Sequence, residues 1–366
     1  MHLAYCSDVE VFNKDQLRDK QWSYRFPGSG WITCLYHIAL ESGISVASGD
    51  IAIANIATNK WNAKDVYVIQ EMRSIDATKL LDLGAKPFLI TCLEAPLYAP
   101  FFYDDINRIA NSFKFSLGFG FSNQQPKNLP FRFPSFYLED MREIRPWEDR
   151  KKLVLVAANK YKTKKIFLAA GLSFIRVLRQ IKSASWQIIS PSYRKSLALS
   201  LHDRRLDAID YFASKNELDL YGSGWGDLGD LPSNWVERLQ KLVDHCYLGL
   251  CQDKLETISH YRFAICFENM ELPGYVTEKI VDCFVAGVVP LYLGAPDIET
   301  IVPVESFVNM RNFKSINDVD VYMSLMAECD AMRMIAAGRA YLQTELGMLH
   351  SYEGFARSII RLVKSC

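Results

Sequence analysis

Short apolar runs alternate with amphipathic segments of helical spacing, and this order constrains the fold more than any other feature of the sequence. In the second half, "FAICFE" is followed by "YVTEKIVDCFVAG", "VVPLYLG" and "SFVNM". In the first half, residues 30–43 ("GWITCLYHIALESG") have helical spacing and end in glycine, whereas "DVYVI" and "KPFLITCLE" predict buried strands. Alternating strands and helices predict parallel sheets, whose ligand-binding groups gather at the carboxyl ends of the strands. We therefore predict an α/β fold.

The chain is long for a single hydrophobic core, because cores stop growing beyond about 250–300 residues and this chain has 366. Residues 145–152 ("RPWEDRKK") are charged and contain a proline, which makes them the candidate linker, and the strand "LVLVAAN" follows them. We therefore predict an N-terminal domain over residues 1–150 and a C-terminal domain over residues 151–340. A helical tail over residues 341–366 is expected to pack across the domain junction.

Composition excludes several classes of protein. Lys plus Arg and Asp plus Glu both number 42, so no net charge attracts nucleic acid, and we expect no nucleic-acid partner. The N-terminus lacks the pattern of a signal peptide, and no apolar run approaches the ~20 residues that cross a bilayer. The 9 cysteines form no CxxC pair, which favours reduced thiols over a disulfide framework or a zinc site. We expect a cytoplasmic protein.

A basic segment with helical spacing covers residues 160–203 and contains "KYKTKK" and "RVLRQIK". Nucleic-acid binding is one interpretation of it. A solvated helical face, or a rim that attracts an anionic substrate, agrees better with the zero net charge. The role of this segment stays open between a solvated helical face and a rim that attracts an anionic substrate.

A charged helix start follows the strand "FAICFE". Pro273 and Gly274 allow a tight turn there, and a helix starting near Tyr275 then directs Thr277, Glu278, Lys279 and Asp282 away from the sheet. The first helical turn carries free N–H groups and a partial positive charge that favour an anion. Lys279 adds a full positive charge, and Glu278 can accept two hydrogen bonds from a sugar diol.

Two further polar elements support a nucleotide site at the same sheet edge. Glu268 and Asn269 stand at the end of the strand, and a glycine turn with Gly222 and Gly224 ("YGSGWG") follows another strand. Both lie at carboxyl ends of strands in the second predicted sheet. The alternative is that Glu278 only complements the helix dipole and that Lys279 is solvated. We favour a nucleotide cleft.

The stretch "FENMELPGYVTEKIVDCFVAGVVPLYLGAP" resembles the signature of glycosyltransferase family 10, the α-1,3/α-1,4-fucosyltransferases. That signature combines Phe-Glu-Asn, Tyr-x-Thr-Glu-Lys and Pro-x-Tyr-x-Gly, and all three occur here. "SFVNMRNF" is similar to the segment that follows in the family, and "DRRLDAIDYF", "LDLYGSGW" and "LITCLEAP" show weaker similarity. Because no Golgi anchor is visible, the resemblance is to the bacterial type.

The resemblance implies an α/β fold of the GT-B type, in which two Rossmann-like domains face one another across a cleft. The first would be the acceptor side and the second would bind the GDP-sugar. It implies an inverting transferase that moves L-fucose from GDP-fucose to a hydroxyl, O3 of GlcNAc, on an oligosaccharide or a lipid-linked glycan. No cofactor and no divalent metal would be required. Two alternatives stay open: a transferase for a related nucleotide-6-deoxysugar, and a catalytically silent module that binds sugar nucleotides or glycans.

The resemblance also implies roles for individual residues. Glu94 in "CLEAP" matches the family's general base. The alternative interpretation is that Glu94 is a helix-capping or loop carboxylate. Glu278 and Lys279 are implied in catalysis as well as in donor binding, because positive charge near the leaving diphosphate lowers the barrier. For the arginine that binds the diphosphate, Arg205 is the first choice and Arg204 the alternative. The donor-binding set is Arg205, Asn269, Tyr275, Glu278, Lys279, Gly222 and Gly224.

Two remaining features have competing interpretations. The acids Asp104-Asp105 and those at residues 318–320 could suggest a metal site, but the first are adjacent and the second lie at a predicted helix start, where caps are common. The tail "SYEGFARSIIRLVKSC" has an apolar stripe and a basic one containing Arg357, Arg361 and Lys364. It could make a weak peripheral contact with a membrane. We favour a packed helix.

Overall fold

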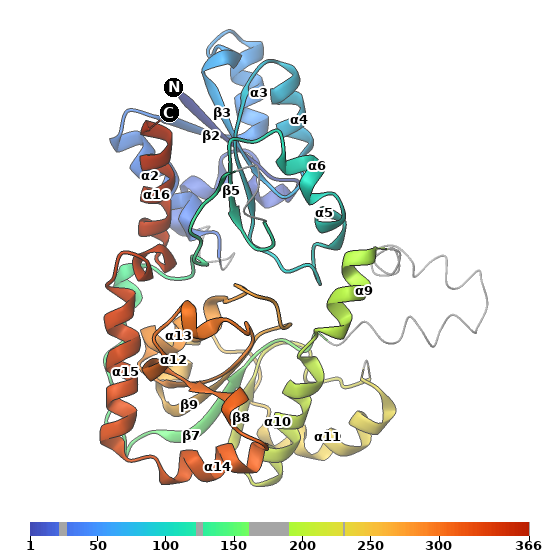
Figure 1. The fold of residues 1–366 in the computed structure, drawn as a ribbon, viewed down its shortest axis with the longest axis vertical. Helices are drawn as coiled ribbons and strands as arrows, with labels where there is room; N and C mark the ends of the chain where they lie inside the picture. The colour runs from blue at the N-terminus through green and yellow to red at the C-terminus, as the bar shows by residue number, and fades with distance from the viewer. Residues whose placement is uncertain (22–27, 122–126, 161–189, 230, 366) are drawn as a thin grey trace, which may run out of the picture. The chain divides into compact units, whose positions relative to one another are not determined.

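The structure, a computed structural model, describes residues 1–21, 28–121, 127–160, 190–229 and 231–365. The chain divides into two compact units, Met1–Glu139 with Thr344–Cys366 as unit 1 and Asp140–Gln343 as unit 2. Each unit is built on one parallel sheet covered by helices (Figure 1). Most of the basic segment predicted at residues 160–203 lies outside the described residues.

Within the described residues, the sheet of unit 1 has six strands in the order β2-β1-β3-β4-β5-β6, all parallel. Successive side chains of a strand point to opposite faces. Leu3 and Tyr5 of β1 therefore join the core beneath α2 and α16, whereas Ala4 and Cys6 join the core beneath α3 and α4. The strands are β1 (His2–Cys6), β2 (Ser45–Ser48), β3 (Val66–Glu71), β4 (Lys86–Cys92), β5 (Phe115–Gly118) and β6 (Lys127–Asn128). The helices are α2 (Gly30–Glu41), α3 (Gly49–Ala57), α4 (Ile75–Asp82), α5 (Pro100–Asp104), α6 (Ile106–Ala110), η9 (Gly347–His350) and α16 (Tyr352–Lys364).

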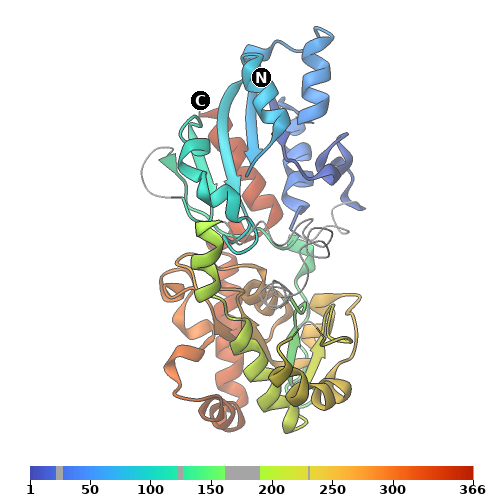
Figure 2. The ribbon, with the colours of Figure 1, turned by 90° about the vertical axis from the view of Figure 1, so that its right-hand side faces the viewer.

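The C-terminal helix α16 belongs to unit 1. Figure 1 shows it beside α2, and Figure 2 shows it behind the strands of the sheet. Phe355 meets Trp31 of α2 edge to face, with ring centroids 5.2 Å apart, and Ile359 and Val363 are buried in the same core. The apolar stripe predicted from the sequence thus packs on α2 inside unit 1, where α2 presents an apolar face to it.

The described part of unit 2 holds a five-stranded parallel sheet in the order β11-β10-β9-β7-β8. One face packs against α10, α11, α14 and α15, and α12 and α13 lie against the other. The strands are β7 (Lys151–Val156), β8 (Leu218–Tyr221), β9 (Tyr261–Phe267), β10 (Val289–Leu293) and β11 (Val308–Asn309). The helices are α9 (Pro191–Ala198), α10 (His202–Ser214), α11 (Ser233–Cys246), α12 (Lys254–Ser259), α13 (Glu278–Ala286), α14 (Ile316–Leu325) and α15 (Glu328–Leu342). In the described parts of the chain, no helix is both long and apolar enough to cross a membrane.

The division between the units falls at Glu139/Asp140, earlier than the predicted boundary at 150/151, and at Gln343/Thr344 instead of 340/341. The first difference arises because the expected linker is anchored in unit 2. The Arg142 amide donates to the Val285 carbonyl (3.1 Å), and Trp147 meets Phe263 with ring centroids 5.7 Å apart. The buried Arg150 guanidinium donates to the Gly287 carbonyl at 2.7 Å. A charged, proline-containing segment is therefore part of the folded unit here.

Other differences from the sequence-based elements are small. β1, β2 and β5 were not predicted from the sequence. The spacing of residues 100–113 ("PFFYDDINRIANSF") predicts one helix, but this stretch forms two short helices, α5 and α6, separated at Asp105, whose carboxylate pairs with Arg73 and Arg108. The strand expected at "SFVNM" is only the two-residue β11. Asp318 caps α14 in a reciprocal bond with Ser315, as expected for a helix start.

Acid should destabilise unit 1 through His350. This side chain is fully buried, its Nδ1 lies 3.0 Å from the Phe133 carbonyl oxygen, and burial lowers its pKa from 6.5 to about 4. Below pH 6.5 the imidazole of His350 binds a proton in the unfolded chain but stays neutral in the folded chain. The contribution of neutral His350 to the free energy of unfolding is therefore fully present above pH 6.5 and is lost as the pH drops toward 4. We expect a loss of about 3 kcal/mol at most over that range. Urea denaturation between pH 4 and 7.5 measures it, and His350→Gln should flatten the dependence; equal slopes in both proteins would contradict the assignment.

Candidate functional site

The order of strands in unit 2 places a switch point beside β7. The chain passes from β7 to β8 on one side and then to β9 on the other side. In open parallel sheets, ligands bind at the carboxyl ends of strands where the direction of winding reverses. The residues that follow β8 and β9 include the predicted Gly222, Gly224 and Asn269. The topology therefore gathers these sequence-predicted residues at one edge of the sheet.

The helix predicted near Tyr275 begins later, at Glu278, with Thr277 as its N-cap. The Thr277 amide donates to Glu268 Oε1 at 2.8 Å, and its hydroxyl donates to Glu268 Oε2 at 2.7 Å. The prediction that Thr277 and Asp282 point away from the sheet is wrong, because they are only 4% and 5% exposed. A buried carboxylate at the end of β9 draws Thr277 inward, and Lys254 of α12 does the same for Asp282.

Glu268 and Lys279 form a buried ion pair at this helix start. Lys279 Nζ lies 2.9 Å from Glu268 Oε2 and 2.8 Å from Thr277 Oγ1, and the Glu268 side chain is 0% exposed. Burial by itself lowers the pKa of Lys279, but the carboxylates of Glu268 and Glu278 raise it above its ordinary value. Lys279 is therefore a charged ammonium held in one place. The sequence pattern indicates Glu268 only as the end of a strand and does not reveal its part in fixing Lys279.

Glu278 stays ionised in this arrangement. Burial raises the pKa of its carboxyl, but Lys279 and Lys254 outweigh that effect and bring the pKa to about 2. Lys254 Nζ is 3.9 Å from Glu278 Oε1 and 2.5 Å from Asp282 Oδ2. The Glu278 side chain is 35% exposed, so its oxygens can still accept hydrogen bonds from a ligand. Lys254 belongs to no recognised motif, and only the packing of α12 on α13 reveals it.

The two arginines left open by the sequence occupy different places. The Arg205 side chain is buried, and its Nη2 donates to the Phe267 carbonyl at 2.9 Å and to Asn269 Oδ1 at 3.3 Å. Arg204 is exposed and lines a cavity of about 320 Å³ together with Arg311 and Lys314. Adjacent residues of a helix point in different directions, which separates the two guanidinium groups. Arg205 is the one that reaches the end of β9.

Backbone pairing holds the loop after β9 against the start of α10. The Leu201 amide donates to the Asn269 carbonyl at 3.1 Å, and the Glu271 amide donates to the Leu199 carbonyl at 2.8 Å. The Asn269 amide group lies 3.5 Å from the hydroxyl of the buried Tyr275. This pairing brings Arg205, Asn269 and Tyr275 together although α10 precedes β9 by many residues.

The glycine turn after β8 approaches the end of β7 closely. Gly222 has φ +128°, and a Cβ on it would lie 2.1 Å from the Ala157 carbonyl oxygen. Gly224 has φ +84° and lies against Asn159. The Trp225 indole donates to the same Ala157 carbonyl at 2.7 Å. The glycines therefore have a packing role, which is to let this turn lie on the switch-point edge.

Glu94 lies in unit 1, shortly after the end of β4, and is exposed. Its backbone carbonyl accepts a hydrogen bond from the Tyr103 hydroxyl at 2.8 Å, which fixes the main chain there. At the end of the neighbouring strand β3, the buried Glu71 carboxylate accepts a 2.5 Å hydrogen bond from the Tyr5 hydroxyl, and burial raises its pKa. Glu71 was not predicted from the sequence, since a single carboxylate after an apolar run belongs to no motif. Unit 1 thus presents two carboxyl groups at the carboxyl ends of adjacent strands.

Part of the chain is similar to a known protein family. Residues 198–334 match the model described as glycosyltransferase family 10 (fucosyltransferase) C-term. An alpha-(1,3)-fucosyltransferase, FucT, of Helicobacter pylori is 37% identical over 75 residues, which cover 20% of this chain and 16% of that protein. An alpha-(1,4)-fucosyltransferase of Arabidopsis thaliana is 28% identical over 121 residues, 31% of this chain and 30% of that protein. The aligned stretches thus span less than a third of either relative.

Solved structures share the fold over a longer stretch. A crystal structure of an alpha1,3-fucosyltransferase covers 100% of this chain and 89% of its own, with 15% identity and a TM-score of 0.51. Anabaena Alr3699/HepE, solved with UDP and glucose, covers 100% of both chains with 8% identity and a TM-score of 0.53. Likeness at this level of identity shows the fold, which is of the GT-B type with two Rossmann-like units. Residues 198–334 of the chain are therefore similar to the C-terminal part of glycosyltransferase family 10, the fucosyltransferase family.

Proposed function

We propose that the protein is an inverting fucosyltransferase that moves L-fucose from GDP-fucose to O3 of a GlcNAc residue in a glycan acceptor. The observation that carries this proposal is the group of Arg205, Asn269, Glu278 and Lys279 at one sheet edge of a family 10 domain. A solved alpha1,3-fucosyltransferase of the same fold is in complex with GDP-fucose, which supports the choice of donor. The matched relatives include both alpha-(1,3) and alpha-(1,4) enzymes, and O3 is the linkage we favour.

In this proposal unit 2 stabilises the departing diphosphate. Negative charge grows on the leaving oxygen as the bond to the anomeric carbon breaks, so cations already fixed nearby lower the barrier. Lys279 is fixed by Glu268, and Arg205 is fixed by the end of β9. The first-turn N–H groups of α13 add partial positive charge. Because the chain supplies this charge, the proposed reaction requires no divalent metal and no cofactor.

Unit 1 supplies the base in the same proposal. The acceptor hydroxyl must lose its proton as it attacks the anomeric carbon from the face opposite the diphosphate. We assign the exposed Glu94 carboxylate as the general base that accepts this proton. A positioned general base typically raises the rate by ~10²–10⁴-fold. Glu278 is assigned to the donor, where its ionised carboxylate accepts hydrogen bonds from the nucleotide sugar.

GDP should stabilise the protein more than GMP does. At about 100 times its Kd, GDP is expected to add about 2.7 kcal/mol of stability and to raise the melting temperature by several degrees. GMP lacks the β-phosphate that we assign to Arg205 and Lys279, so its shift should be smaller at the same concentration. Differential scanning fluorimetry measures both shifts. Equal shifts with GDP and GMP would remove the diphosphate assignment.

Two variants separate the neighbouring arginines. Arg204→Gln changes an exposed side chain and should leave the difference between GDP and GMP intact. Arg205→Lys keeps the charge but loses the guanidinium geometry at the end of β9, and should reduce that difference. If Arg204→Gln abolishes the difference and Arg205→Lys preserves it, the diphosphate role passes to Arg204.

Incubation with a panel of sugar nucleotides and glycans, read by mass spectrometry, separates transfer of fucose from transfer of a related deoxysugar or from binding alone.

A further inference from the structure

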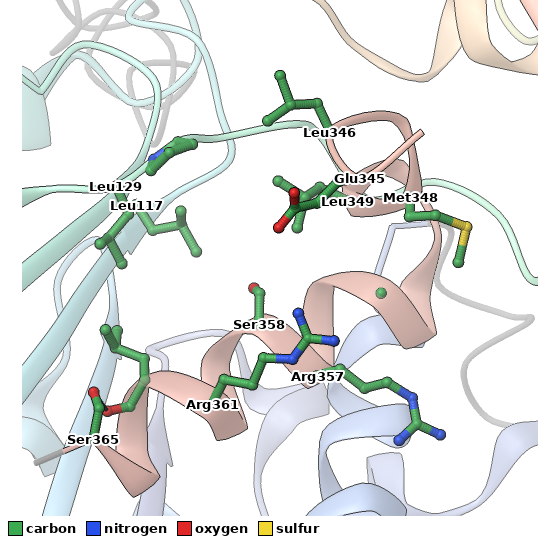
Figure 3. Close-up of a pocket in the computed structure, with 13 residues that line it drawn as sticks. Leu117, Leu129, Glu345, Leu346, Met348, Leu349, Arg357, Ser358, Arg361 and Ser365 are labelled. Carbon is green, nitrogen blue, oxygen red and sulfur yellow. Dashed lines mark hydrogen bonds between the residues drawn. The ribbon is translucent and has the colours of Figure 1, made fainter. Parts of the chain in front are cut away.

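Unit 1 contains a cavity of about 590 Å³ that the proposed reaction does not use. It lies between the β5–β6 edge of the sheet and the segment formed by η9 and α16 (Figure 3). None of the residues assigned to the donor or to the base lines it. Its volume is in the range of about 300–1,000 Å³ that is typical of small-molecule sites.

Most of the wall is aliphatic. Leu117 and Leu129 come from the sheet edge, and Leu346 and Leu349 come from the segment around η9. Leu346 is 46% exposed, so an apolar side chain stands in water beside the cavity. A wall of this kind binds a hydrocarbon chain through the apolar area that the chain removes from water.

The remaining wall is a polar strip on α16. In Figure 3, Ser358 and the guanidinium of Arg361 lie on the cavity side of the helix, whereas the guanidinium of Arg357 points away. Within the described residues, the Arg361 side chain has neither a hydrogen bond nor an ion pair. Glu345 faces the cavity from the opposite wall, and the lining holds two guanidinium groups, those of Arg357 and Arg361, against this one carboxylate.

We propose that this cavity binds a lipid phosphate, with its hydrocarbon chain among the leucines and its phosphate at Arg361. A guanidinium binds phosphate through paired, charge-assisted hydrogen bonds, and an unpaired arginine loses no existing partner on doing so. A neutral amphiphile would leave Arg361 without a role, and a cationic one would meet like charge there. The site goes beyond the proposed transfer, and its occupancy is measured without donor or acceptor, so its failure and that of the transferase assignment are distinguishable.

The test uses dodecyl phosphate below its critical micelle concentration, titrated calorimetrically into the full chain. We expect saturable binding with one molecule per chain and weaker binding of dodecyl maltoside and of dodecyltrimethylammonium. Hydrogen exchange should show protection by dodecyl phosphate in residues 345–365. Equal binding of the three amphiphiles, or protection outside this segment only, would overturn the proposal.

A matched pair of variants distinguishes the cavity from general attraction to a basic helix. Arg361→Gln removes the cation on the cavity side and should weaken dodecyl phosphate binding by roughly tenfold. Lys364→Gln removes an exposed cation of the same helix that does not line the cavity, and should leave the affinity within about twofold. Both side chains are exposed, so neither variant should change the melting temperature. Equal losses in the two variants would show adsorption to the helix surface and refute the site.

Discussion

Glu94→Gln should lower fucose transfer by about 10²–10⁴-fold and leave donor binding almost unchanged. The amide has the shape of the carboxylate but cannot take the proton of the acceptor hydroxyl. The side chain is exposed, and the main chain at this position is held by the Tyr103 hydroxyl, so the substitution should not disturb folding. Transfer is measured with GDP-fucose and an N-acetyllactosamine acceptor, and GDP affinity by calorimetry.

Glu139→Gln is the matched control for Glu94→Gln. Glu139 is another exposed carboxylate of unit 1, and its partner is Lys20 at the surface. Exposed ion pairs of this kind contribute little to stability, so Glu139→Gln should fold normally. Glu139 has no assigned role in the reaction, so the transfer rate of the Glu139→Gln variant should stay near that of the native chain. Normal transfer by Glu94→Gln would remove the base assignment. A large loss in Glu139→Gln would direct attention to this second carboxylate.

Glu268→Ala should cost about 3–5 kcal/mol of stability, because it leaves the ammonium of Lys279 buried without its carboxylate. The pair is 2.9 Å long, with side chains 0% exposed at Glu268 and 15% exposed at Lys279. The substitution also frees the amide and hydroxyl of Thr277, which both donate to Glu268. GDP affinity should fall with it, since Lys279 is then no longer held at the start of α13. Urea denaturation and calorimetry measure the two effects.

A double substitution and a surface control test the same ion pair. Glu268→Ala with Lys279→Met removes both charges and should recover part of the lost stability, because no unpaired charge remains buried. Glu271→Gln breaks a more exposed pair with Arg311, whose side chains are 33% and 35% exposed, and should cost no more than about 1 kcal/mol. Equal costs for Glu268→Ala and Glu271→Gln would refute the view that Glu268 holds Lys279.

Local sequence pattern was enough to predict the elements that carry the candidate site. The strands β7, β9 and β10 appear where apolar runs predict them, and α13 ends at Ala286, with Gly287 as its C-cap at φ +73°. Spacing along the chain fixes which side of such an element is apolar, and that information is local. The same is true of the signature around Glu278 and Lys279, which indicated the family before any contact was known. The roles of these residues stay predictions until the variants are measured.

The pattern was weakest where elements are short. β2 and β5 span only Ser45–Ser48 and Phe115–Gly118, too few residues to show a clear period. The helix start at residues 275–278 was placed too early, because "YVTEK" has helical spacing but Thr277 turns inward to Glu268. A hydrogen bond to the preceding strand outweighed the local preference there.

Partners far apart in the sequence were decided by the tertiary structure alone. The local sequence around Lys279 does not indicate that Glu268 pairs with it. The local sequence around Asp282 does not indicate its ion pair with Lys254 either. Likewise, α16 has the apolar stripe that its sequence predicts, but only folding shows that this stripe covers α2 and returns the C-terminus to unit 1. The sequence determines which side of each element avoids water, because that depends on neighbours one or two turns away. Which buried charges meet depends on how the strands are ordered and the helices are layered, and that order is set only when the whole core closes.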